Sequence, residues 1–164
     1  AAGARATLIG HSERRQLFGE TDADTRKKLV AALQAGLDPV LCVGETLSEQ
    51  EAGKTLAVIT RQLAAALAES DGATLTRVTI AYEPVWAIGT GTNARPRDAA
   101  EVHRQVRAWL TAHGAPGTRV LYGGSVNLRN VAELVAEPEL DGVLVGGASL
   151  DPDGWARLVQ SGAA

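Results

Sequence analysis

The sequence predicts an α/β fold in which parallel strands alternate with helices. Five short apolar runs recur along the 164 residues, and each is followed by a helical pattern. Each run is aliphatic or β-branched on both faces, which is typical of strands buried on both sides of a parallel sheet. Polar and glycine-rich residues follow the runs directly, where α/β proteins carry their sites. We therefore expect a single domain over residues 1–164, with βα units and right-handed crossovers.

The elements follow in a regular order along the chain. The expected strands cover residues 6–10, 39–44, 77–83, 119–124 and 141–147. The expected helices cover residues 22–36, 55–69, 96–112, 127–136 and 153–160. Pro96 suits the first position of a helix, and Gly36 and Gly114 suit positions just after helix ends. No linker long enough to divide the chain separates these elements, so one domain is expected.

Composition and charge exclude several classes of partner. The net charge is −3 and the estimated pI is about 5.6, so nothing predicts binding to nucleic acid or to an anionic membrane surface. No apolar run is long enough to span a bilayer, and no signal-peptide pattern opens the chain. The single cysteine, Cys42, excludes an internal disulfide and fits a reducing, cytoplasmic compartment. Zinc and calcium spacings are both absent, so no metal is expected.

The carboxylate of Glu83 is the first candidate for chemistry. It ends an expected strand and precedes Pro84 and an apolar segment with Trp86 that runs to the glycines at 89 and 91. Burial beside apolar neighbours raises the pKa of a carboxyl toward the range of a general base. A carboxylate that only marks the end of the strand is the alternative. The segment that follows has the composition of a lid.

His11 also follows an expected strand, in the stretch GHSERR. At a helix start the imidazole is held neutral and could donate a hydrogen bond to a substrate oxygen. The alternative is a purely structural histidine. The turns YGGS and VGGAS each lie between a strand and a helix. Their backbone N–H groups suit an anion, although either turn alone is also explained as a tight βα connection.

Five motifs in this order resemble the triosephosphate isomerase family. They are GHSERR (10–15), CVGE (42–45), AYEPVWAIGTG (81–91), YGGSV (122–126) and VGGASL (145–150). The resemblance implies the family's (β/α) TIM barrel and a glycolytic isomerase without a metal or an organic cofactor. It makes Glu83 the proton-shuttling base, His11 the group that polarises the carbonyl, and Glu13 a supporting residue.

The resemblance also assigns the ligand contacts. Backbone groups at Gly89, Ser125, Gly146 and Gly147 would hold the phosphate. The lid would comprise Pro84, Val85, Trp86, Ala87, Ile88, Gly89, Thr90 and Gly91. The ligand would be a small phosphorylated molecule, with phosphate or sulfate as simple substitutes.

Departures from the family pattern qualify these expectations. The family barrel has eight units in about 250 residues, and the match covers roughly the last five. The family's N-terminal Asn and catalytic Lys have no counterpart, because Lys27, Lys28 and Lys54 all lie outside the motifs. Arg95 stands where the family usually caps a helix with Ser or Thr, so the far end of the lid is expected to be looser.

An incomplete barrel leaves strand edges and an inner face uncovered, which favours self-association, most simply as a homodimer. Three functions compete. For the isolated chain we place phosphate binding without catalysis first and a weak isomerase second, so isomerase activity is expected to be weak or absent. An active isomerase completed by an N-terminal half or by a second chain is the alternative.

Overall fold

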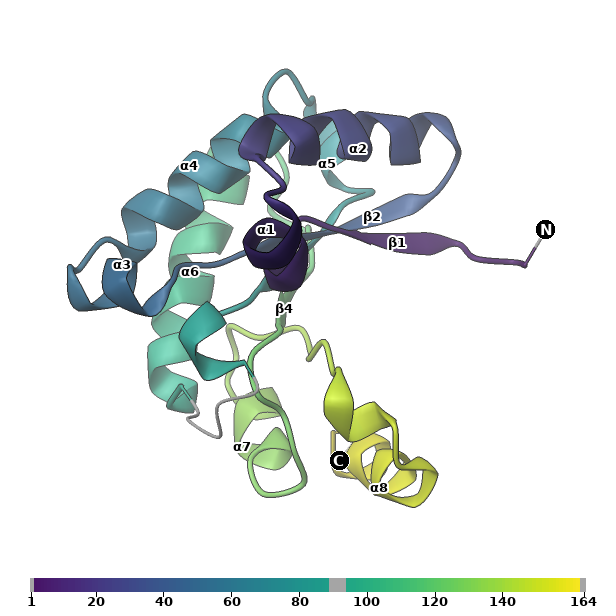
Figure 1. Cartoon of the computed structure of the whole chain (residues 1–164), viewed down its shortest axis with the longest axis vertical. Helices are drawn as coiled ribbons and strands as arrows, with labels where there is room; N and C mark the ends of the chain where they lie inside the picture. Colours follow the sequence, from purple (N-terminus) through teal and green to yellow (C-terminus); the bar gives the residue numbers. More distant parts are fainter. Residues whose placement is uncertain (1, 89–93, 163–164) are drawn as a thin grey trace.

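The computed structural model describes residues 2–88 and 94–162, and it confirms the α/β fold. Four parallel strands form one sheet in the order β1-β2-β3-β4 (Figure 1). They are β1 (Ala6–Ile9), β2 (Asp38–Val43), β3 (Thr79–Tyr82) and β4 (Val120–Tyr122). Strands that follow each other in the sequence are therefore neighbours in the sheet. Because all four are parallel, their carboxyl ends lie at the same edge.

The prediction of a fifth strand at residues 141–147 is wrong in extent. This segment pairs with β4 through one parallel bridge between Val143 and Tyr122. The N–H of Leu144 donates to Tyr122 at 2.8 Å, and the N–H of Tyr122 donates to Gly142 at 3.0 Å. Gly142 has a φ of 153°, and two glycines follow at 146 and 147, so an extended ladder is interrupted at both ends. The segment still follows β4 in parallel and brings its glycines to the same edge.

The helices agree with the expected pattern for the long elements and add short ones. The described helices are α1 (Ser12–Phe18), α2 (Asp22–Gln34), α3 (Leu47–Glu51), α4 (Thr55–Leu67), α5 (Gly72–Leu75), α6 (Pro96–Ala112), α7 (Val131–Val135) and α8 (Pro152–Gly162), with 3₁₀ turns η1 (Val85–Ala87) and η2 (Gly147–Ser149). Gly36 and Gly114 have φ values of 76° and 80°, as a glycine after a helix end requires. The short α3 and α5 are missing from the sequence prediction, which placed a helix start at His11 but gave no bounds for α1.

Helix α7 begins later than predicted. The residues before it form a turn in which Asn130 accepts from the N–H of Asn127 and Asn127 accepts from the N–H of Arg129. Such side-chain to backbone bonds compete with helix formation. In Figure 1, α7 and α8 lie together beyond β4, far from the N-terminal end of β1.

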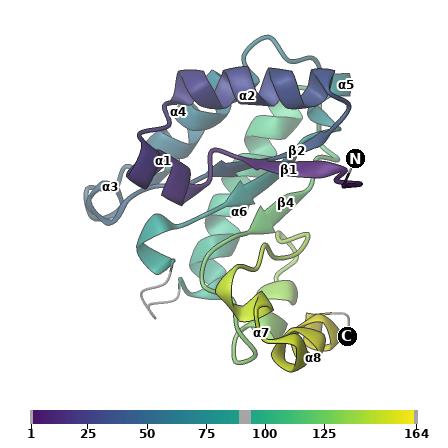
Figure 2. The same cartoon turned by 45° about the vertical axis from the view of Figure 1, so that its right-hand side comes forward.

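One face of the sheet is buried under helices. Ile9, Leu41, Ile80 and Val120 lie side by side across the four strands and are at most 4% exposed. Helices α2, α4 and α6 pack against the strands on this side, and Figure 2 shows α2 and α4 running along it. Burial of this apolar row supplies the main hydrophobic stabilisation of the sheet.

The opposite face is more open than the sequence pattern predicted. Leu8, Val40 and Thr79 are aligned across it, and Leu8 is 49% exposed while the other two are half-buried. The expectation of strands buried on both sides is therefore wrong for this row, although Cys42 and Ala81, two residues further along the same face, are 0% exposed. The pattern of apolar residues cannot distinguish a covered face from an uncovered one.

Candidate functional site

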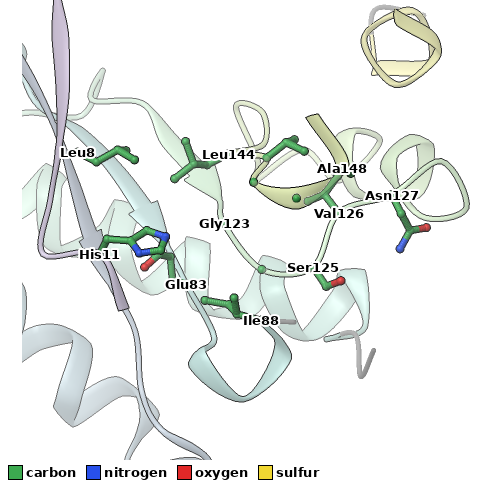
Figure 3. A pocket seen from close by; sticks show the side chains of 14 residues that line it. Leu8, His11, Glu83, Ile88, Gly123, Ser125, Val126, Asn127, Leu144 and Ala148 are labelled. Carbon is green, nitrogen blue, oxygen red and sulfur yellow. The ribbon is translucent and has the colours of Figure 1, made fainter. Parts of the chain in front are cut away.

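The carboxyl ends of three strands and the segment after β4 meet at one cavity. It has a volume of about 400 Å³ and opens on the less covered side of the sheet. Its lining comprises Leu8, His11, Glu83, Ile88, residues 123–127 and residues 144–148 (Figure 3). His11 comes two residues after β1, Glu83 one residue after β3 and Gly123 one residue after β4. The parallel topology thus collects residues that are far apart in sequence.

Glu83 and His11 are in direct contact within this cavity. The Nε2 atom of His11 lies 3.1 Å from Oε1 of Glu83. The other carboxylate oxygen, Oε2, accepts a hydrogen bond of 2.9 Å from the backbone N–H of Ser12. Both oxygens of a side chain that is only 3% exposed are therefore satisfied, as burial of a carboxylate requires.

The position of His11 at the start of α1 determines its tautomer. His11 is the N-cap, and its Nδ1 accepts a hydrogen bond of 3.3 Å from the backbone N–H of Glu13. A neutral imidazole that accepts at Nδ1 carries its proton on Nε2. In its neutral form His11 therefore donates toward Glu83.

Burial raises the pKa of Glu83 above its usual value. The nearby His11 and the N–H of Ser12 act in the opposite direction, since both stabilise the carboxylate, but burial outweighs them. A buried carboxyl with a raised pKa that still reaches a cavity has the chemistry of a general base. Cys42, behind it in β2, is fully buried, and burial raises the pKa of its thiol, so it stays protonated.

The glycines of the two turns have different surroundings. A Cβ on Gly123 would lie 2.9 Å from Cγ of Glu83, and one on Gly124 would lie 2.2 Å from the hydroxyl of Tyr122. These two glycines allow close packing. A Cβ on Gly146 or Gly147 would meet nothing within 4 Å. The VGGAS turn therefore presents bare backbone to open space, while the YGGS turn supports the position of Glu83.

The predicted lid is described only in its first half. Pro84 leads into η1 (Val85–Ala87), and the indole N–H of Trp86 donates to Oε1 of Glu45 at 2.9 Å. Ile88 lines the cavity. Gly89, Thr90 and Gly91 lie outside the described residues. At the far end Arg95 makes no capping hydrogen bond and instead pairs with Asp98 at 2.7 Å.

Several predicted residues share the cavity, and others lie apart or were missed. Ser125, Gly146 and Gly147 line it with His11 and Glu83, whereas the Glu13 side chain is exposed and outside the lining. The lining side chain of Asn127 and the N–H of Ser12 were not predicted from the sequence. The GHS stretch was the available signal for Ser12, because a helix start leaves N–H groups free.

Cationic and metal-binding groups are scarce at this site. Among the described residues that line the cavity, none is a lysine or an arginine. Within residues 2–88 and 94–162, no cluster of three or more His, Cys, Asp or Glu side chains could hold a metal ion.

In the same part of the chain, no helix is both long and apolar enough to cross a membrane.

The fold and the cavity place this chain among the α/β proteins whose sites lie at the carboxyl ends of parallel strands. Comparison with known sequences is more specific. Residues 1–162 match the family profile described as triosephosphate isomerase. The chain belongs to the triosephosphate isomerase family.

Curated relatives agree with this assignment. Triosephosphate isomerase of Pseudomonas savastanoi pv. phaseolicola is 51% identical over 163 residues, which cover 98% of this chain and 65% of the relative. The enzyme of Pseudomonas syringae pv. syringae is 52% identical with the same coverage. That of Paracidovorax citrulli is 51% identical, and 64% of its length is covered. The chain thus spans about 65% of the length of these relatives.

Proposed function

We propose that this cavity binds a small phosphorylated ligand, or phosphate or sulfate in its place, and that Glu83 and His11 are its proton-transfer pair. The observation that carries the proposal is the shared cavity, in which the His11–Glu83 pair and the open VGGAS backbone line the same space. The reaction would be the interconversion of glyceraldehyde 3-phosphate and dihydroxyacetone phosphate. In the isolated chain we expect it to be weak or absent.

The chemistry assigns complementary roles to the two side chains. Glu83 would remove a proton from the carbon next to the carbonyl and return it to the neighbouring carbon. His11 would donate its Nε2 proton to the carbonyl oxygen as negative charge develops there. Glu13 would support His11 through its backbone N–H, which already contacts Nδ1 at 3.3 Å. Because Nε2 now faces Glu83, the ligand has to separate the two groups.

The phosphate would lie against the backbone of Gly146 and Gly147, with Ser125 and Gly89 beside it. The open space in front of Gly146 and Gly147 supports this placement. Residues 84–91 would close over the ligand and exclude water from the reactive intermediate. No metal or organic cofactor is needed for proton transfer between two adjacent carbons.

Weak turnover is expected because the described lining offers no lysine or arginine to the developing charge. Loss of one preorganised donor to an oxyanion typically costs about 3 to 4 kcal/mol, or roughly a hundred- to a thousandfold in rate. A coupled assay with glyceraldehyde 3-phosphate should compare the chain with Glu83→Ala. Any residual activity should disappear in the variant, and equal nonzero rates in both would reject Glu83 as the base.

Anion binding is tested separately. Inorganic phosphate should raise the melting temperature, and chloride at the same ionic strength should not, since only a ligand of the folded state stabilises it. Gly147→Asp should abolish the effect, because it places a negative carboxylate where the anion would lie. The new side chain fits without a steric conflict, since a Cβ on Gly147 meets nothing within 4 Å. Gly117→Asp is the matched control, since a Cβ there also meets open space and Gly117 lies outside the cavity lining. No response to millimolar phosphate would leave the turns with a structural role only.

The second candidate is an active isomerase completed by additional polypeptide, either an N-terminal half or a second copy. Two observations favour it. Leu8 is 49% exposed in the inner row of the sheet, which comprises Leu8, Val40 and Thr79. The chain also spans only about 65% of the length of the relatives. Co-expression with the N-terminal third of one of these relatives should then raise the rate in the coupled assay. The same rate with and without that segment would argue against completion.

A further inference from the structure

The side chain of Gln62 forms a two-point contact with the backbone next to the site. Gln62 lies on α4 and is only 4% exposed. Its Oε1 accepts from the N–H of Gly44 at 2.8 Å, and its Nε2 donates to the C=O of Gly44 at 3.1 Å. A buried amide on a core-facing helix costs free energy unless it is fully hydrogen-bonded, so this pairing accounts for a polar residue at that position.

Gly44 directly follows the end of β2, and neither neighbouring strand pairs with it in the described sheet. Pairing between β1 and β2 ends at Ile9 and Leu41, and β2 ends at Val43. The amide of Gln62 thus extends the hydrogen bonding of β2 by one residue, in place of a neighbouring strand. A hydrocarbon side chain of the same length would leave both backbone groups of Gly44 without this partner.

Gly44 in turn contacts the backbone of Glu83. A Cβ on Gly44 would lie 1.7 Å from the carbonyl oxygen of Glu83, so the two main chains touch. On either side of this contact, the N–H of Glu83 donates to Val43 at 2.7 Å and the N–H of Val85 donates to Glu45 at 3.1 Å. A shift of Gly44 therefore moves the backbone that carries the Glu83 carboxylate.

We propose that Gln62 is a positioning residue for Glu83: it clamps Gly44, and Gly44 holds the Glu83 backbone so that the carboxylate meets His11 and the N–H of Ser12. Gln62 lies outside the cavity lining and acts only through Gly44. The inference rests on the proposed function, because Gln62 would position Glu83, the general base of that proposed site. It adds a residue from the helical layer to a site otherwise built at strand ends.

The test is the titration of the Glu83 carboxyl carbon by NMR, with its resonance assigned by Glu83→Gln. Gln62→Met keeps the length of the side chain and removes both hydrogen bonds. We expect the midpoint of Glu83 to move by about half a pH unit or more, because the carboxylate leaves its fixed partners. Gln105→Met is the matched control, since Gln105 is exposed on α6 and bonds only Glu101 among the described residues.

A folded Gln62→Met chain with lower stability and an unchanged Glu83 midpoint would overturn the proposal, because a purely structural role predicts that result. Hydrogen exchange in the unmodified chain gives a second test that needs no variant. The Gly44 amide should be protected like those of β2, and exchange as fast as in an exposed loop would overturn the clamp.

These measurements need no ligand, so they separate the clamp from the proposed function. Absent phosphate stabilisation together with a shifted Glu83 midpoint would overturn the anion site and support the clamp. Intact phosphate stabilisation with an unchanged midpoint would support the anion site and overturn the clamp.

Discussion

The Nε2 atom of His11 lies 3.1 Å from Oε1 of Glu83. The two residues follow different strands, β1 and β3, and are 72 positions apart in the sequence. The contact is supported on both sides, because the N–H of Glu13 fixes the imidazole and the N–H of Ser12 fixes the carboxylate. All four polar side-chain atoms of the pair therefore have a partner.

Replacement of Glu83 should change how stability depends on pH. Burial raises the folded-state pKa of Glu83, so the folded chain holds this proton more tightly than the unfolded chain. Its contribution to stability is fully present below the unfolded value of 4.5 and is lost as the pH rises through the folded pKa. The unfolding free energy of the unmodified chain, relative to Glu83→Gln, should therefore increase from pH 7 to pH 4.

Urea denaturation at both pH values measures this difference. Glu133→Gln is the control, because Glu133 is exposed on α7 and its replacement should leave the pH dependence unchanged. A relative stability that falls toward pH 4 would contradict the assignment of Glu83 as a carboxyl with a raised pKa.

Gly44→Ala should be strongly destabilising. The added Cβ would lie 1.7 Å from the Glu83 carbonyl oxygen, a backbone atom that cannot rotate away. We expect a loss of about 3 kcal/mol or more in the free energy of unfolding, at the upper end for an added methyl in a packed interior. Gly117→Ala, where a Cβ meets nothing within 4 Å, should cost little. Similar stabilities for the two variants in thermal unfolding would contradict the close approach of the two backbones.

His103 should make the fold sensitive to acid. It is fully buried on α6, its Nδ1 lies 3.3 Å from the carbonyl of Glu139, and its ring packs edge-on against Tyr82. Burial lowers the pKa of His103 from 6.5 to about 4. Stability is therefore lost as the pH falls from about 6.5, where the unfolded chain takes up the proton first, and the loss is nearly complete near pH 4.

This group should account for about 2 to 3 kcal/mol of the stability lost between pH 7 and pH 4.5. His103→Gln should remove that component, so its stability should depend less on pH than that of the unmodified chain. His113→Gln, at an exposed histidine just after the same helix, should leave the pH dependence nearly unchanged. Equal pH dependence in the two variants, measured by urea denaturation, would refute the role of His103.

Self-association should depend on exposed apolar side chains at the end of α1. Leu17 and Phe18, at the end of α1, are 72% and 67% exposed. Adjacent exposed apolar residues favour association, so we expect the chain to form dimers at micromolar concentration. Replacing both with serine should roughly halve the mass found by light scattering, toward 17.0 kDa. Leu47→Ser, at an exposed leucine of α3, should have a smaller effect, and a monomeric unmodified chain would contradict the prediction.

The long helices and the strand positions could be predicted from sequence because their signals are local. Helix α6 begins at Pro96 and ends at Ala112, as expected from the proline at its start and the glycine at 114. Only the start of the short helix α1 could be predicted, since seven residues show too little periodicity to define its extent. The fifth strand was overestimated, because its apolar pattern fits a strand whether or not a ladder forms.

By itself, the sequence determined the α/β class, the family and several residues that line one cavity, namely His11, Glu83, Ser125, Gly146 and Gly147. These depend on residue type, order and spacing, which are fully present in the chain. Only the tertiary structure decided that His11 and Glu83 bond to each other, that the inner row of the sheet is partly uncovered, and that Gln62 reaches Gly44. Such contacts join residues far apart in sequence, and their geometry depends on how the helices and strands pack, which no local pattern specifies.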